Sequence, residues 1–411
     1  MDPKDVREAA RTVLEGNRVI GDNFFYTCPS TGTYQHQWLW DSCFHAIIWT
    51  YFDSENAKRE LISMVANQHE NGMLPHMNYW KSSSGLIPRL GDWLFGRLWP
   101  EKNRSYITQA PVIGQAVEAV FKATHDRNFL AQMLKPLQRY FDWLHLERNE
   151  KISSDGLVSI LHPWETGMDL LPIWDHIHGI KRLFTLRSGL WLSKIIKQYN
   201  KVDWDIEKIK ELDLFLVKDV SFNVIYILNL LSLANLCDLL DQKEKGRTYR
   251  SRANIAKIAL EEKCWDDETK FFYSIHSLKD TFLPEITVSG LFPTCLDINQ
   301  KKLDALVKDH LLNEDEFWLP YPIPSVAKSS LHFKAEGSSM VLWRGPTWFN
   351  TNWYIVKGLQ KHGFNESASE IIQKMREMVE ISGFREQYNP FTAKGHGAKN
   401  FSFSTLLVDL L

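Results

Sequence analysis

The stretch "RNFLAQMLKPLQRYFDWLHLERN", residues 127–149, decides the fold class. Its apolar residues recur at spacings of three and four, the period of an amphipathic helix with one buried face. A second stretch, "FNVIYILNLLSLANLCDLL", residues 222–240, is apolar all round and predicts a fully buried helix, because Asn and Asp residues interrupt it too often for a membrane span. Half-exposed helices alternating with buried ones predict an all-α fold, a double-layered helical barrel.

The same periodicity predicts helices along the rest of the chain. We predict them at 2–14, 42–52, 54–69, 110–124, 127–148, 173–197, 222–241, 244–262, 299–311, 347–361, 364–380 and 401–410. Strand signals are few and short. The sequence shows neither a linker rich in Pro, Gly and Ser nor a repeat of fixed period, so we predict that residues 1–411 form a single domain rather than an open solenoid.

The composition is that of a globular protein without a strong charge bias. The 411 residues are 44% hydrophobic with a formal net charge of −2, whereas a nucleic-acid or anionic-membrane partner normally requires a basic excess. We therefore expect no nucleic acid and no membrane among its partners. The five cysteines are scattered and predict neither a disulfide framework nor a zinc site. The first residues lack the pattern of a signal peptide, so we expect a cytoplasmic protein.

Long segments rich in aromatic residues, Gly and Pro separate the predicted helices. They lie at 76–108, 160–175, 318–348 and 382–400. Long structureless loops in a compact domain tend to be functional, so we expect the functional site there. The first of them contains Ser and Gly clusters and could close over the site as a lid.

The stretch "YQHQWLWDSCFHAIIW", residues 34–49, places tryptophans beside polar residues. Asp41 precedes an apolar run and could cap the helix there, with Trp38 and Trp40 in the core. The alternative is a sugar subsite, in which tryptophan faces stack on a pyranose ring while Asp and His bind its hydroxyls. Taken alone, this stretch leaves both interpretations open.

Two loop segments carry carboxylates beside aromatic residues. Asp169 ends "WETGMD", where Glu165 and the nearby Asp175 share its aromatic surroundings, and Glu386 lies in "FREQYNP". Burial against an aromatic group raises the pKa of a carboxyl, which a general acid requires. One carboxylic acid that protonates the leaving oxygen and one carboxylate opposite it make up a glycosidase site. A non-catalytic carbohydrate-binding protein would have no use for both, and a helical scaffold for protein partners would lack an aromatic pocket.

The motifs "QWLWDSCFHA", "GMLPH", "WETGMD", "PSV", "WRGPTWFNTNW", "FREQYNP" and "FSFSTLLVDLL" occur in this order, within a match that runs from about residue 34 to the C-terminus. In order and spacing they resemble glycoside hydrolase family 63, more closely its compact branch of mannosylglycerate and glucosylglycerate hydrolases. The resemblance implies an (α/α)6 barrel and hydrolysis with inversion at the anomeric carbon. It implies neither metal nor cofactor for the chemistry.

Matched motif by motif, the resemblance implies roles for individual residues. Asp169 falls at the position of the general acid and Glu386 at that of the general base. The positions that hold the sugar, or lie near its pocket, are Tyr34, Trp38, Trp40, Asp41, His76, Gln115, Arg344 and Trp348. The implied activity is exo-acting release of an α-linked glucosyl or mannosyl unit from a small acceptor, foremost glycerate. The alternative is an α-glucosidase or trehalase-like hydrolase of neutral sugars.

The chain departs from the family pattern at a few positions. Leu170 and Leu171 follow Asp169 where the family usually has a polar pair. Gln387 and Phe403 stand where Tyr and Trp are expected. These departures concern the walls of the expected pocket and leave both candidate catalytic carboxylates in place.

Overall fold

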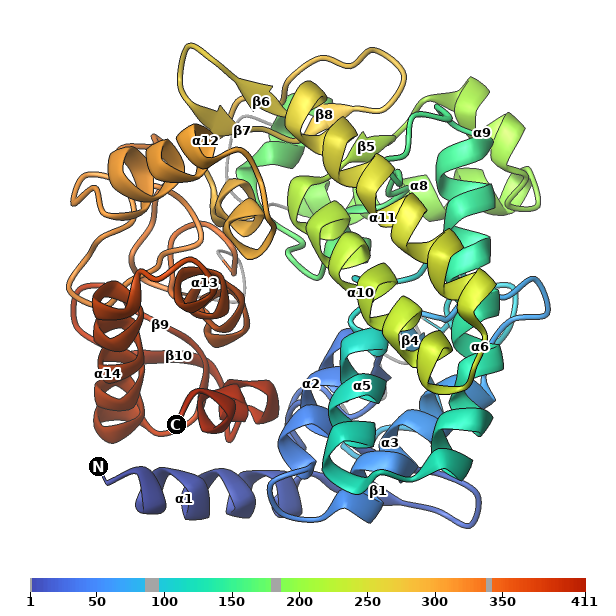
Figure 1. The fold of residues 1–411 in the computed structure, drawn as a ribbon, viewed down its shortest axis with the longest axis horizontal. Helices are drawn as coiled ribbons and strands as arrows, with labels where there is room; N and C mark the ends of the chain where they lie inside the picture. Colours follow the sequence, from blue (N-terminus) through green and yellow to red (C-terminus); the bar gives the residue numbers. More distant parts are fainter. Residues whose placement is uncertain (1, 86–95, 179–185, 338–341) are drawn as a thin grey trace.

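The computed structural model describes residues 2–85, 96–178, 186–337 and 342–411. Within them, six buried helical elements form a closed ring, in which each element contacts the next and the last returns to the first (Figure 1). In ring order these are α2 (Leu39–Trp49), α5 (Ile113–Thr124), α10 (Val220–Leu239), η4 (Val288–Cys295), α13 (Phe349–Lys361) and η6 (Ser402–Leu410). The elements η4 and η6 are 3-10 helices.

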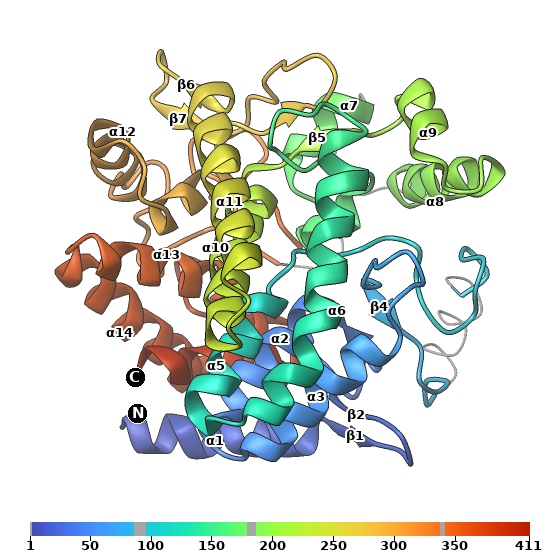
Figure 2. The same ribbon diagram turned by 45° about the vertical axis from the view of Figure 1, so that its right-hand side comes forward.

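An outer helix packs on each member of this inner ring. In the same order, the outer helices are α3 (Ser54–Ala66), α6 (Arg127–His145), α11 (Lys243–Lys263), α12 (Gln300–Ala305) with the π-helical turn η5 (Leu306–Leu311), α14 (Asn365–Ser382) and α1 (Pro3–Gly16). Because α1 packs on η6, the two chain ends lie side by side (Figures 1 and 2). This double ring confirms the predicted (α/α)6 barrel.

Burial distinguishes the two layers. Every residue of α2 is buried, whereas α11 buries only one stripe and exposes its charged face, as its amphipathic pattern requires. Helix α10 is long and apolar enough to cross a membrane by length and composition alone. However, 83% of its most apolar window is buried inside the protein, as expected of a core helix.

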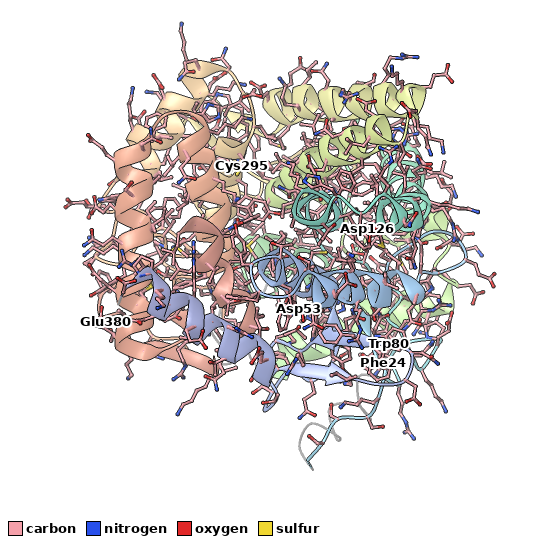
Figure 3. All side chains as sticks on the ribbon, turned by 60° about the horizontal axis from the view of Figure 1, so that its bottom comes forward. Phe24, Asp53, Trp80, Asp126, Cys295 and Glu380 are labelled. Carbon is pink, nitrogen blue, oxygen red and sulfur yellow. The ribbon has the colours of Figure 1, made fainter. Side chains whose placement is uncertain are left out.

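The connections at the two ends of the barrel differ in length. Those that lead from an inner to an outer element are short: Asp53 caps α3 and Asp126 caps α6 through their carboxylates (Figure 3). Those that lead from an outer to an inner element are long, and they comprise residues 17–38, 67–112, 146–219, 264–287, 312–348 and 383–401. Long loops therefore gather where the inner elements begin.

The long connections contain the strands, which pair as antiparallel two-stranded sheets. The pairs are β1 (Arg18–Ile20) with β2 (Phe25–Thr27), β3 (Gln37–Trp38) with β4 (Met77–Asn78), β5 (Val217–Lys218) with β8 (Ile275–His276), β6 (Trp265–Asp266) with β7 (Phe271–Phe272), and β9 (Arg385–Tyr388) with β10 (Gly395–Lys399). Phe24 next to β2 stacks on Trp80 with ring centroids 5.0 Å apart, which joins the first two long connections (Figure 3). These contacts give the loops a defined shape.

Several predicted elements differ from the structure. The predicted helix 173–197 comprises two helices that lie apart, α7 (Asp175–His178) and α8 (Leu186–Lys201), while residues 179–185 are outside the described part (Figure 2). Helix α9 (Ile206–Leu212) and the 3-10 turns η2 (Pro163–Thr166) and η3 (Pro172–Trp174) were not predicted, and the π-helical turn η1 (Leu146–Glu150) extends α6. The inner element η4 was also not predicted from the sequence, because Gly290 and Pro293 are typical of loops.

Candidate active site

A pocket with about 490 Å³ of empty space, counting its open mouth, lies where the inner elements begin. Five of the six long connections line it, and each of the four predicted functional loops contributes to it. The lining residues are Pro29, Tyr34, Trp38, Trp40, Asp41, His76, Gln109, Gly167, Asp169, Leu342, Trp343, Trp348, Glu386, Phe401 and Phe403. Eight of the ten residues singled out in the sequence are among them.

Aromatic rings that fix one another form the walls. Trp343 and Trp348 stack face to face with centroids 3.9 Å apart, and Trp348 Nε1 donates to the Leu342 carbonyl at 3.0 Å. On another side, Trp38 meets His76 edge to face at 4.7 Å. Because these rings are held by contacts with one another, the pocket offers preformed faces on which a sugar ring can stack.

Asp169 lies in the pocket on the loop between α6 and α10. Gly167 has the left-handed φ of 73° and packs directly on the ring of Trp40, so a side chain at 167 would clash there. The Met168 carbonyl accepts Trp174 Nε1 at 3.1 Å, which holds the turn from its other side. Burial, and then the nearby charge of Glu386, raise the pKa of Asp169 to about 7. This carboxyl can therefore carry a proton at near-neutral pH.

Glu386 reaches the pocket from β9 and is held by two donors. The Tyr34 hydroxyl donates to Oε1 at 2.9 Å, and the Ala398 amide donates to Oε2 at 2.8 Å. Burial raises the pKa of Glu386, while these two hydrogen bonds oppose the rise by stabilising the ionised form. Gly397 lies against this carboxylate at a φ of 65° and leaves no room for a Cβ. The net pKa of Glu386 is raised, and the two donors limit that rise.

Asp41 lines the pocket, but it does not cap α2. The helix begins at Leu39, so Asp41 falls in its first turn, and Gln109 Oε1 instead accepts the amide of Trp40 at 3.1 Å. Burial raises the pKa of Asp41 to about 7. Burial also lowers the pKa of His76 to about 3, so this imidazole is neutral and can act as either donor or acceptor.

Gln115 does not line the pocket, contrary to its predicted place in the sugar site. Its Oε1 accepts Asn229 Nδ2 at 2.9 Å and the Tyr354 hydroxyl at 3.1 Å, so it joins α5, α10 and α13 inside the barrel. The glutamine at the pocket is Gln109, which sequence reasoning missed. The signal that could have found it is its position in a long loop, whereas Gln115 lies within a helix.

Arg344 also lies behind the wall rather than in it. Its two terminal nitrogens donate to the Asp175 carboxylate at 2.6 and 2.8 Å. Glu165 is likewise structural, because Arg148 donates to both its oxygens at 2.7 and 2.9 Å. Of the three carboxylates in and beside "WETGMD", only Asp169 faces the pocket.

The departures from the family pattern fall into two groups. Leu170 and Leu171 are buried and outside the pocket lining, so apolar packing replaces the expected polar pair. Gln387 is buried on β9, also outside the lining, whereas Phe403 forms part of the wall beside Trp40 with centroids 6.2 Å apart. In the predicted lid at 76–108, residues 86–95 lie outside the described part of the chain.

Comparison with known proteins identifies the family. Residues 34–404 match a domain family described as the mannosylglycerate hydrolase MGH1-like glycoside hydrolase domain. The chain belongs to this family. A mannosylglycerate hydrolase from Thermus thermophilus is 31% identical, with 93% of this chain and 95% of the relative covered. A glucosylglycerate hydrolase from Mycolicibacterium hassiacum is 27% identical, with 99% and 97% covered.

A solved structure from the same family agrees. The crystal structure of a family 63 mannosylglycerate hydrolase from Thermus thermophilus, in complex with Tris and D-glycerate, matches with a TM-score of 0.86 at 28% identity. The match covers 98% of this chain and 99% of the other. Membership of the MGH1-like family confirms the predicted resemblance to glycoside hydrolase family 63, and with it that the protein is a glycoside hydrolase rather than a carbohydrate-binding protein.

Proposed function

We propose that this MGH1-like glycoside hydrolase is an exo-acting, inverting enzyme that cleaves α-mannosyl or α-glucosyl glycerate into the free sugar and glycerate. One observation carries the proposal: among the three carboxyls that line one aromatic pocket, Asp169 and Glu386 have different environments. Asp169 has a pKa raised to about 7, while Glu386 receives two hydrogen bonds that favour its ionised form. Two carboxyls whose environments differ in this way suit the acid and the base of a glycosidase.

In the proposed reaction, protonated Asp169 donates its proton to the glycosidic oxygen as the bond to the anomeric carbon breaks. A water molecule attacks that carbon from the opposite face and loses a proton to Glu386. The attack inverts the configuration, so an α-glycoside yields a β-sugar. Tyr34 holds the base in place through its hydroxyl.

The substrate class is supported by the relatives. Their names specify mannosylglycerate in Thermus thermophilus and glucosylglycerate in Mycolicibacterium hassiacum, and the solved Thermus enzyme holds D-glycerate. The stacked pair Trp343 and Trp348 supplies a face for the sugar, and Asp41 supplies an acceptor for its hydroxyls. The substrate is thus a small carbohydrate conjugate with an anionic leaving group.

The proposal is tested by following the anomeric protons by NMR while the enzyme acts on α-mannosylglycerate, α-glucosylglycerate, trehalose, kojibiose or nigerose. The expected result is early release of a β-sugar from one of the glycerate conjugates. If only a neutral disaccharide were cleaved, the leaving group would be a neutral sugar rather than glycerate. An α-sugar appearing first would exclude inversion.

The roles of the two carboxyls are tested by substitution. Asp169→Asn and Glu386→Gln should each lower kcat by at least about a hundredfold with the fold retained, because general acid–base catalysis contributes roughly 10²–10⁴ in rate. Circular dichroism and thermal unfolding check the fold. Lys58→Gln, which breaks an ion pair with Asp126 away from the pocket, is the control and should leave kcat unchanged. An active Glu386→Gln enzyme would remove Glu386 from the mechanism.

A further inference from the structure

Arg344 and Asp175 form a buried ion pair just behind the pocket wall. The two terminal guanidinium nitrogens of Arg344 meet the two oxygens of Asp175 at 2.6 and 2.8 Å, and Arg344 is only 5% exposed. Such a two-point contact fixes the relative orientation of the two side chains as well as their distance. It joins segments that are 169 residues apart in the sequence.

Each partner belongs to a segment that carries pocket residues. Asp175 directly follows Trp174, whose Nε1 bonds to the Met168 carbonyl next to Asp169. Arg344 directly follows Trp343, which stacks on Trp348 in the wall. The pair therefore links the loop that carries the candidate general acid to the aromatic face on which the sugar would stack.

The backbone at Arg344 is firmly held. Its carbonyl accepts the Lys334 amide at 2.7 Å, and the next amide, that of Gly345, donates to Ser325 Oγ at 2.8 Å. Gly345 has a φ of 144° and lies so close to the Lys334 backbone that no Cβ fits. The segment that carries Trp343 and Arg344 is thus held in place, and through Asp175 it can position the loop that carries Asp169.

Polar groups from neighbouring segments also lie around the pair. His332 Nδ1 lies 3.4 Å from Arg344 Nη1, and His332 Nε2 lies 3.4 Å from Glu285 Oε1. His176 Nε2 approaches the same Glu285 oxygen at 3.3 Å. Both terminal nitrogens of Arg344 are therefore engaged by protein groups, and Arg344 is not among the residues that line the pocket.

We propose that Arg344 and Asp175 are positioning residues, which hold Asp169 in register with the Trp343–Trp348 wall, and that Arg344 does not bind the substrate. The inference rests on the proposed role of Asp169 as general acid. A displacement of about 1 Å at a reacting group can cost about 10²-fold in rate. Loss of the pair should therefore impair proton donation much more than substrate binding.

The test compares two substrates that share one sugar, either mannose or glucose, whichever the enzyme accepts. The first is the α-glycosyl glycerate, whose leaving oxygen requires a proton. The second is the α-glycosyl fluoride, whose fluoride departs without one. Both reactions need Glu386 and the attacking water, so only a defect in proton donation separates them.

The variants are Arg344→Lys, Asp175→Asn and the double variant Arg344→Gln with Asp175→Asn. The double variant leaves no unpaired buried charge, so it should fold even where a single variant does not. Each should lower kcat on the glycerate conjugate by about tenfold or more, with KM changed less than about threefold and the fluoride rate nearly unaffected. The double variant should lose no more than the worse single one, because both changes remove one interaction.

Three results would overturn the inference. If Arg344 variants raised KM at constant kcat while Asp175→Asn lowered kcat, the guanidinium would be a substrate contact. Equal losses on both substrates would show that the pair does not act through Asp169. Wild-type kinetics in every variant would show that the pair has no part in turnover.

Asp169→Asn, measured in parallel, separates this inference from the proposed function. If it loses activity on the glycerate conjugate but not on the fluoride, Asp169 is the acid, and failure of the pair variants then concerns the pair alone. If it cleaves the conjugate at the wild-type rate, the acid assignment fails, and the inference about the pair fails with it.

Discussion

At the scale of single residues, hydrogen bonds distinguish the two proposed catalytic carboxyls. Burial raises the pKa of both Asp169 and Glu386 and so favours their neutral forms. Of these two carboxyls, only Glu386 accepts hydrogen bonds from two donors within the described part of the chain, the Tyr34 hydroxyl and the Ala398 amide. Hydrogen bonds to a charged form stabilise it, so the two acids in one pocket can hold different protonation states.

Tyr34→Phe tests this directly. Without the hydroxyl, the pKa of Glu386 rises, so the acidic limb of the kcat/KM–pH profile should move to higher pH, because the base must be ionised. A hydrogen bond to a charged group is worth about 1.5–3 kcal/mol, so kcat/KM at acidic pH should fall roughly ten- to hundredfold. The alkaline limb, which the proposed acid Asp169 with its pKa of about 7 should set, serves as the internal control. An unmoved acidic limb would contradict the role of Tyr34.

At the scale of elements, the short sheet of β9 and β10 positions Glu386, the proposed base. The register of the two strands shifts between His396 and Lys399, and this irregularity brings the Ala398 amide onto Glu386. Gly397 makes the approach feasible, because it has a positive φ and no side chain to meet the carboxylate. The position of Glu386 on β9 therefore depends on β10, the strand opposite it.

Gly397→Ala should lower kcat by about a hundredfold, since the added methyl overlaps Glu386 and displaces it. Gly383→Ala is a matched control: Gly383 has a φ of 69°, close to the 65° of Gly397, but nothing lies within 4 Å of its Cβ position. Both variants should lose about 1–3 kcal/mol of unfolding free energy, because alanine is strained at a positive φ. The same kcat in both would show that the contact with Glu386 is unimportant.

At the scale of the whole molecule, polar contacts inside the inner ring hold it together. Gln115 on α5 accepts from Asn229 on α10 and Tyr354 on α13, so one side chain joins three of the six inner elements. These groups are largely removed from solvent, where an unsatisfied donor costs free energy. Gln115 therefore stabilises the barrel beneath the pocket.

Gln115→Met, which keeps the volume but removes the acceptor, should lower the free energy of unfolding by about 1–3 kcal/mol and leave KM unchanged. Gln109→Met at the pocket is the comparison and should raise KM. Denaturant unfolding and steady-state kinetics measure both. A rise in KM without loss of stability in the Gln115 variant would show that Gln115 acts in the sugar site and not in the barrel.

The helical layers could largely be predicted from the sequence, because burying one face of a helix imposes a spacing of three or four on its apolar residues. Thus α6, predicted at 127–148, spans Arg127–His145 and continues into η1. The inner element η4 could not be found in this way. Its Gly and Pro residues resemble a loop, and only its packing between α10 and α13 makes it part of the ring.

The sequence by itself determined the fold class, the family and the loops that form the pocket, since each rests on local pattern or on motifs in order. Only the tertiary structure decided which polar side chains face that pocket. Gln109 lines it while Gln115 is turned into the barrel, and Arg344 is held by Asp175 behind the wall. The reason is physical: the direction of a side chain depends on helix rotation and on partners far away in the chain, which local spacing does not specify.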